Sequence, residues 1–162
     1  MKKVILTGAN GFVGHHILEH FLKNTDWDIY CLDKLGYASA GHDRIRDINA
    51  FDNKRTHIFP MDLSLPLQEG LIKELGEIEY IFHVAADSHV DNSISDPVPF
   101  VQNNVNSTLH ILEYARKLWS LKKFIYFSTD EVYGSAPVGK NYKEGERFNC
   151  GNPYSASKGA AE

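Results

Sequence analysis

The stretch Lys3–Gly14, KVILTGANGFVG, decides the fold of this 162-residue chain. Its first part, Lys3–Thr7, is an apolar run with the length of a buried β-strand. The segment Phe12–Lys23 that follows the loop has a helical pattern. Its apolar residues recur at four-residue spacing: Val13, Ile17 and Phe21. A buried strand that leads through a short loop into a helix predicts the first half of a βαβ unit.

The loop between strand and helix carries three glycines, Gly8, Gly11 and Gly14, in the spacing G-x-x-G-x-x-G. Glycine allows a tight turn and a close approach of the backbone to a pyrophosphate, whose charge lies at the helix N-terminus. Glycines alone would also suit an ordinary turn. The next predicted strand, however, ends at Asp33, 19 residues after Gly14. A carboxylate in that place accepts hydrogen bonds from an adenosine ribose and repels a 2′-phosphate, so we predict a dinucleotide site that prefers NAD to NADP.

Apolar runs of strand length alternate with helical patterns along the rest of the chain. The further predicted strands are Ile29–Asp33, His57–Met61, Tyr80–Ala85 and Lys123–Ser128. A long helix is predicted over Pro97–Leu118, with Val101, Val105, Leu109 and Leu112 on one side, and a loop with a short helix over Gly36–Lys54. Strands that are apolar throughout and separated by helices imply a parallel sheet covered on both faces. The predicted fold class is therefore α/β, with a doubly wound, Rossmann-type parallel sheet.

Composition excludes several classes of partner. The net charge of −4 gives no reason to expect nucleic acid or an anionic membrane as partner. No apolar run reaches the roughly 18 residues of a transmembrane helix. The two cysteines, Cys31 and Cys150, are far apart and form no CxxC motif, so we expect a protein of the reducing cytoplasm. The eight histidines lack ligand spacing such as HExxH, which predicts no metal site.

Two more predicted strands end in residues that suit the dinucleotide site. Asp62, at the end of the third strand, is placed either to face the adenine amine or to act as a helix N-cap. Ala85 and Ala86, at the end of the fourth, are small enough to let the backbone lie against the cofactor. His83 in the same strand is predicted to be a core residue.

The stretch Phe127–Gly134, FSTDEVYG, places the neighbouring acids Asp130 and Glu131 at the end of a buried strand, where charge is costly. A turn would explain these acids, and so would an active site.

A tyrosine and a lysine further along point to the active site. Tyr154 and Lys158 are four residues apart on a helix that Asn152 and Pro153 begin as N-cap and first residue. They therefore share one face. An ammonium nearby and the dipole of the first helical turn favour the phenolate, which predicts a lowered pKa for Tyr154. Such a tyrosine takes a proton from a sugar hydroxyl while hydride leaves the same carbon for NAD.

Four motifs together resemble one family. TGANGFVG, HVAADSHVDNSI, STDEVYG and NPYSASKGAAE occur in the order found in nucleotide-sugar 4,6-dehydratases of the extended short-chain dehydrogenase/reductases, most closely those that act on dTDP-glucose. The resemblance implies oxidation at C4, elimination of water across C5 and C6, and return of hydride to C6. It assigns the acid to Asp130, the base to Glu131, a hydrogen bond to the 4-oxygen to Thr129, and the C4 base and its partner to Tyr154 and Lys158.

The same resemblance implies the cofactor contacts and the assembly. The expected NAD-binding residues are Gly8, Gly11, Phe12, Val13, Gly14, Asp33, Lys34, Asp62, Leu63, Ala85, Ala86, Ser88, Asn103, Tyr154 and Lys158. The final helix stops at Glu162 without a glycine or proline, so residues 1–162 are expected to be the dinucleotide-binding domain at the front of a longer protein, with the C-terminal part of the family fold absent. The substrate is expected to be a nucleotide sugar, and the helices Pro97–Leu118 and that of Tyr154 are expected to pair with their copies in a homodimer.

Two alternatives stay open from the sequence. The first is an NAD-dependent nucleotide-sugar 4-epimerase or decarboxylase, which the acid pair argues against. The second is a non-catalytic NAD-binding fragment.

Overall fold

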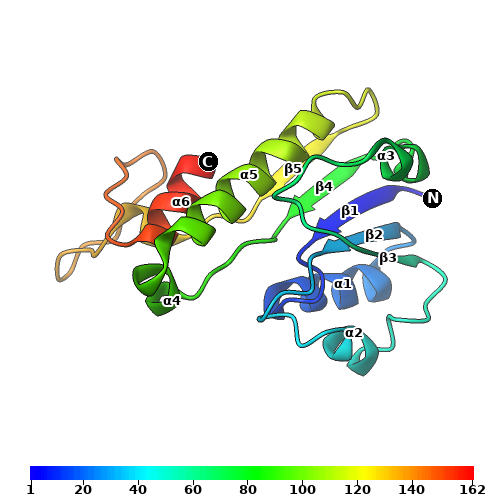
Figure 1. Ribbon diagram of the computed structural model, residues 1–162, viewed down its shortest axis with the longest axis horizontal. Helices are drawn as coiled ribbons and strands as arrows, with labels where there is room; N and C mark the ends of the chain where they lie inside the picture. The colour runs from blue at the N-terminus through cyan, green and yellow to red at the C-terminus, as the bar shows by residue number, and fades with distance from the viewer.

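Five parallel strands form the sheet of the computed structural model, which describes residues 1–162, in the order β3-β2-β1-β4-β5 (Figure 1). The elements are β1 (Lys3–Thr7), α1 (Phe12–Asn24), β2 (Asp28–Asp33), α2 (Asp43–Asp47), β3 (Thr56–Pro60), α3 (Glu69–Leu75), β4 (Tyr80–His83), α4 (Val90–Ser95), α5 (Pro97–Ala115), β5 (Lys123–Tyr126), the 3₁₀ turn η1 (Asp130–Tyr133) and α6 (Pro153–Ala161). The strand order reverses between β1 and β4, so the predicted doubly wound, Rossmann-type sheet is confirmed.

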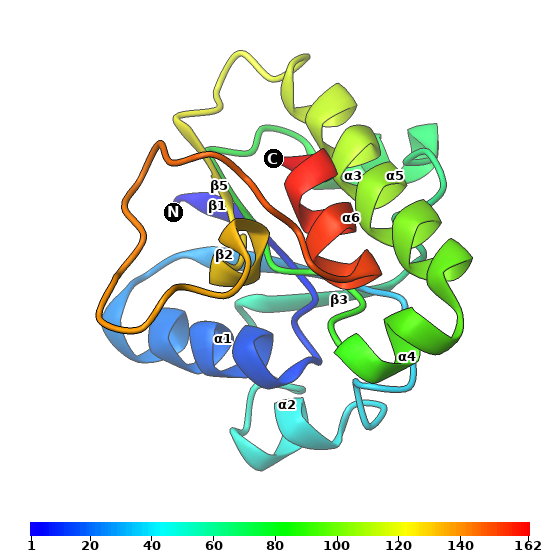
Figure 2. The same ribbon diagram turned by 90° about the vertical axis from the view of Figure 1, so that its left-hand side faces the viewer.

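Helices cover both faces of the sheet, as Figures 1 and 2 show. On one face α1 and α2 pack Leu18, Phe21 and Ile45 against Leu6 of β1 and Cys31 of β2. The other face lies under α3 and α5. Its core consists of Ile5, Leu32, Leu75, Ile81, Ile111 and Tyr114, together with neighbours of the same kind. Neighbouring residues of β1 thus point to opposite cores, which explains why the buried strands are apolar along their whole length.

The predicted strands all exist, but some end earlier than expected. β4 stops at His83 because the next two backbone N–H groups, of Val84 and Ala85, each donate to the hydroxyl oxygen of Thr7 at 3.0 Å. That contact turns the chain out of the sheet at the point where β1 also ends. The short helices α3 and α4 were not predicted, since they have seven and six residues and carry no clear apolar stripe.

The apolar faces predicted for the two main helices are partly wrong. In α1, Phe21 is buried, but Val13 is 48% exposed and lines a cavity instead. In α5 the predicted apolar side is the exposed one, with Val101, Leu109 and Leu112 between 41% and 52% exposed. The side that faces the protein consists of Phe100, Asn104, Ser107, Thr108, Ile111, Tyr114 and Ala115. Small polar residues occupy it because they bind the loop after β4 and the helix α6.

None of the helices combines the length and apolar character that a membrane crossing requires.

Candidate active site

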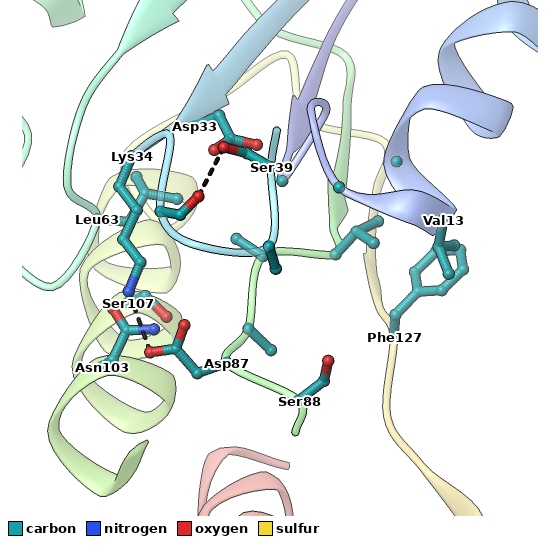
Figure 3. A pocket seen from close by; sticks show the side chains of 18 of the residues that line it. Val13, Asp33, Lys34, Ser39, Leu63, Asp87, Ser88, Asn103, Ser107 and Phe127 are labelled. Carbon is teal, nitrogen blue, oxygen red and sulfur yellow. Dashed lines mark hydrogen bonds and ion pairs between the residues drawn. The ribbon is translucent and has the colours of Figure 1, made fainter. Parts of the chain in front are cut away.

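A cavity of about 530 Å³ opens at the carboxyl ends of the strands, where the strand order reverses between β1 and β4 (Figure 3). This is the place at which open parallel sheets bind their ligands. All the residues predicted to bind NAD line it except Asp62: Gly8, Gly11, Phe12, Val13, Gly14, Asp33, Lys34, Leu63, Ala85, Ala86, Ser88, Asn103, Tyr154 and Lys158. Residues spread over most of the chain therefore meet around one cleft.

The glycine loop needs glycine for steric reasons. Gly8 has φ +69°, and a Cβ there would lie 2.9 Å from the backbone of Ala85. A Cβ on Gly14 would lie 2.0 Å from the carbonyl oxygen of Gly8. The N-cap of α1 is Gly11, which offers no side-chain oxygen to the first N–H groups of the helix, and the first turn holds no acid. These N–H groups are free to bind an anionic group, so the loop fits a pyrophosphate.

Asp33 is held rigidly at the end of β2. Its side chain is buried, and its two oxygens accept the backbone N–H groups of Asn10 at 2.9 Å and Leu35 at 2.8 Å. Each carboxylate oxygen can accept a further hydrogen bond. The side chain also lines the cavity, so it fits the hydroxyls of a ribose.

An ion pair that the sequence did not suggest crosses the cleft. Lys34 Nζ lies 3.0 Å from Asp87 Oδ2, and Figure 3 shows the two side chains reaching toward each other. Asp87 is fixed in turn by Asn104 of α5, whose side-chain oxygen accepts the Asp87 N–H at 2.8 Å and whose amide donates to the Asp87 carbonyl at 2.9 Å. No local pattern marks this anchor, because Asn104 is one of several polar residues in α5.

Asp62 does not line the cavity, and it is not a helix N-cap. Its Oδ1 accepts the backbone N–H of Ser64 at 2.8 Å in a turn, whereas α3 begins later, with Gln68 as its N-cap. Burial raises the pKa of Asp62, but the hydrogen bonds from Ser64 and the charge of Lys34 outweigh it and lower the pKa overall. The N-cap interpretation was therefore wrong, and a contact with adenine stays a prediction.

Other lining residues escaped sequence reasoning. The cavity also receives Gly36, Ala38, Ser39, Arg44, Met61, Val84, Asp87, Ser107, Phe127 and Ser128. Arg44 donates to the carbonyls of Asn10 and Ala38, which ties the loop after β2 to the glycine loop. No local pattern marks this arginine, because its partners lie on two different loops.

Tyr154 and Lys158 both face the cleft from α6. Asn152 and Pro153 begin this helix as predicted, which places Tyr154 in its first turn. Lys158 is 2% exposed, donates from Nζ to the Phe127 carbonyl at 2.6 Å and lies over the ring of Tyr126. Burial lowers its pKa to about 8, although Glu162 opposes the shift.

The predicted lowering of the Tyr154 pKa is wrong for the protein without ligand. Burial raises the pKa of Tyr154, and the charges of Glu131 and Asp130 raise it further, while a hydrogen bond with Thr129 acts in the opposite direction. Lys158 does not offset these effects because its ammonium is directed at the end of β5.

The acid pair lies in η1, directly after β5. Thr129 is the N-cap of this turn and accepts the N–H of Glu131 at 3.3 Å. Glu131 is half-buried and its Oε2 accepts a hydrogen bond from Asn152 Nδ2 at 2.8 Å, whereas Asp130 is exposed. The charges of both acids raise the pKa of Tyr154, so each carboxylate would act on the phenol.

The cleft as a whole fits a dinucleotide, with a glycine cradle, a ribose acceptor at Asp33 and a tyrosine and lysine at the mouth. No group of three or more histidine, cysteine, aspartate or glutamate side chains is arranged to hold a metal ion. A doubly wound sheet with these features defines a nicotinamide-dependent protein of the short-chain dehydrogenase/reductase class.

Comparison with known proteins gives the family. Residues 5–162 match the model of the GDP-mannose 4,6-dehydratase family, so the chain belongs to this family of nucleotide-sugar dehydratases. The dTDP-glucose 4,6-dehydratase of Salmonella typhimurium is 32% identical over 177 residues, which cover 99% of this chain and 48% of that protein. The chain thus spans about half the length of the curated relatives it matches.

Solved structures agree with the fold and the cofactor. The dTDP-glucose 4,6-dehydratase of Streptomyces venezuelae, with NAD and TYD bound, superimposes with a TM-score of 0.86 at 30% sequence identity. The match covers 99% of this chain and 49% of that protein's chain. The UDP-Glc/GlcNAc 4-epimerase of Campylobacter jejuni has a TM-score of 0.81 at 31% identity, with 99% and 47% covered. The predicted family and the NAD cofactor are confirmed.

Proposed function

We propose that the whole protein converts dTDP-glucose to its 4-keto-6-deoxy derivative with NAD as a bound cofactor. One observation carries this proposal: Asp130 and Glu131 lie in η1, directly after the cleft-lining residues Phe127 and Ser128, and their charges act on the phenol of Tyr154, which lines the same cleft. A simple hydride transfer at C4 needs only the tyrosine. Elimination of water needs a further base and a further acid, which neighbouring carboxyls supply.

The first step is assigned to Tyr154, Thr129 and Lys158. When bound, NAD supplies the hydride acceptor and, in its oxidised form, a positive charge in the cleft. That positive charge favours the phenolate, against the burial and the two acids that raise the pKa of Tyr154. Lys158, which lines the same cleft from the same helix, is the proposed partner of Tyr154. Tyr154 then takes the proton of the C4 hydroxyl. Thr129, the N-cap of η1, holds the 4-oxygen.

The second step is assigned to the acid pair. A ketone at C4 acidifies the C5 proton, because the carbanion is delocalised into the carbonyl. Glu131 takes this proton, and Asp130 protonates the C6 hydroxyl, which leaves as water. Their surroundings differ, since Glu131 is half-buried and accepts a hydrogen bond from Asn152, while Asp130 is exposed.

We further infer that residues 1–162 are the dinucleotide-binding domain and that the part of the relatives that this chain does not span completes the sugar-nucleotide pocket. The exposed apolar side of α5, together with α6, is the proposed homodimer interface. Val98 at 59% and Leu109 at 52% exposure lie on it. Sedimentation of the wild-type protein and of Leu109→Asp tests the interface: a dimer that the substitution dissociates supports it, and a wild-type monomer contradicts it.

The activity is tested by product analysis with protein expressed from the complete reading frame. Incubation with NAD and dTDP-glucose should give a C6 methyl signal in the proton NMR spectrum. The double variant Asp130→Asn, Glu131→Gln should still oxidise C4 but accumulate the 4-keto-hexose and reduced nicotinamide, since loss of a positioned acid or base costs about 10²–10⁴-fold in its step. Formation of the methyl product by this variant at the wild-type rate would show that the acids are only turn residues.

A 4-epimerase is the second candidate, because several of the similar structures are those of 4-epimerases. Only dehydration creates a C6 methyl group. A product that is epimerised at C4 and keeps its C6 hydroxyl would therefore show that the protein is a 4-epimerase. UDP-glucose and GDP-mannose, assayed in parallel, report which nucleotide the protein accepts. Absence of any product with all three would favour the non-catalytic NAD-binding fragment.

A further inference from the structure

The N-cap of α6 makes one more contact than capping requires. Asn152 Oδ1 accepts the backbone N–H of Ser155 at 2.8 Å, and Ser155 Oγ accepts the N–H of Asn152 at 3.2 Å, which completes a capping box. Serine, threonine and aspartate offer the same oxygen to a helix terminus. Only asparagine adds N–H donors on the same side chain. Its Nδ2 donates to Glu131 Oε2 at 2.8 Å, across 21 residues of sequence.

This contact leaves the two oxygens of Glu131 in different situations. Oε2 is bound by Asn152, while Oε1 accepts no hydrogen bond from the protein. The backbone of Glu131 is fixed as well, since its N–H donates to Thr129 Oγ1 and its carbonyl accepts the N–H of Gly134 at 3.0 Å. A carboxylate held at its backbone and at one oxygen presents the other oxygen in one direction, as a base requires.

The contact also joins the base to the helix that carries the tyrosine. Pro153, whose φ is restricted by its ring, is the only residue between Asn152 and Tyr154. The N–H of Tyr154 donates to the buried Ser93 of α4 at 3.2 Å, which holds this end of α6 in place. A shift of Asn152 would therefore change the placement of Glu131 relative to Tyr154.

We propose that Asn152 is a positioning residue that binds Oε2 of Glu131 and so directs Oε1 toward the C5 proton of the oxidised sugar. This inference rests on the proposed dehydratase function. It adds a requirement that capping alone does not impose, namely a side-chain N–H donor at the N-cap.

Variants at the N-cap separate positioning from capping. Asn152→Ser keeps the capping oxygen and removes the donor, and Asn152→Asp does the same while it places a like charge against Glu131. Ser155→Ala is the matched control, because it removes one half of the capping box and leaves the contact between Asn152 and Glu131. Each protein is assayed for its thermal midpoint, for C4 oxidation from the absorbance of reduced nicotinamide, and for exchange of the C5 hydrogen in deuterated water.

We expect the ratio of C5 exchange to C4 oxidation to fall roughly 10–10²-fold in Asn152→Ser, and at least as far in Asn152→Asp, with thermal midpoints close to the wild-type value. Ser155→Ala should lower the midpoint and leave the ratio unchanged. If the ratio instead follows the midpoint across the three variants, Asn152 is only a helix cap and the inference is wrong.

A second measurement does not depend on turnover. The side-chain amide signals of Asn152 in a nitrogen–proton NMR correlation spectrum should shift when Glu131→Gln replaces the charged acceptor, and unchanged signals would show that the contact is absent in solution. The two proposals fail in different ways. If the wild-type protein shows no C5 exchange, both the proposed dehydratase function and this inference are wrong. If Asn152→Ser shows normal C5 exchange, only this inference is wrong.

Discussion

Lowering the pH should destabilise the protein through one buried histidine, His83. Its side chain is fully buried between two hydroxyls, with Nδ1 2.8 Å from Thr7 Oγ1 and Nε2 3.0 Å from Thr108 Oγ1. Thr7 Oγ1 already accepts the N–H groups of Val84 and Ala85, so its own proton goes to Nδ1 of the ring. Nε2 therefore carries the proton of the neutral ring and donates it to Thr108. A second proton on Nδ1 would face an oxygen whose lone pairs are in use.

The magnitude follows from the pKa of His83. Burial, with a smaller contribution from the charge of Lys158, lowers this pKa to about 3, whereas an unfolded histidine titrates near 6.5. Between these values the unfolded state binds more protons than the folded state. The stabilisation is thus fully present above about pH 6.5 and is lost as the pH falls toward 3. From about pH 7.5 to pH 5 the loss amounts to about 2 kcal/mol.

The assay is urea unfolding of the wild-type protein and of His83→Gln at both pH values. The variant cannot titrate at this position, so its free energy of unfolding should fall by about 2 kcal/mol less on acidification, although it starts from a lower value. The neighbouring Lys158 and Tyr126, with pKa values of about 8 and about 12, are present in both proteins, so their titration contributes equally to both and does not disturb the comparison. An equal loss in the two proteins would refute the reasoning, since another group would then account for the whole pH dependence.

Three further predictions concern the cleft. Gly14→Ala should abolish NAD binding and destabilise the fold by about 1–3 kcal/mol, because its Cβ would lie 2.0 Å from the Gly8 carbonyl oxygen. The control Gly70→Ala on α3, whose Cβ would have no atom within 4 Å, should bind NAD normally in the same titration. Equal binding by the two variants would contradict the steric argument. NADP should bind more weakly than NAD, and Asp33→Asn should narrow the difference, as measured by their dissociation constants; tighter binding of NADP by the wild type would remove the role of Asp33. Tyr154→Phe should slow C4 oxidation about 10²–10⁴-fold in single-turnover absorbance, and an undiminished rate would mean that another group takes the C4 proton.

Much of the fold could be predicted because its signals are local. A strand, the glycine loop and the helix after it lie within a few residues of one another, so their pattern alone indicates the unit. The same holds for Asn152 and Pro153 at the start of α6. The helix faces were harder, since apolar periodicity says which residues share a side of α5 but not which side meets the protein. The side of α5 that carries Val101, Leu109 and Leu112 is exposed, because the buried side uses Asn104 to bind the loop after β4 and Thr108 to bind His83.

The sequence by itself determined the succession of the five strands and the main helices along the chain, the dinucleotide loop and the family of the protein. Each of these depends on which residues follow one another. Only the tertiary structure decided the ion pair of Lys34 with Asp87, the hydrogen bond of Asn152 with Glu131 and the raised pKa of Tyr154. Charge interactions and burial depend on distances in space. The residues concerned are brought together by loops, whose conformation cannot be predicted from the periodicity of apolar residues in the sequence.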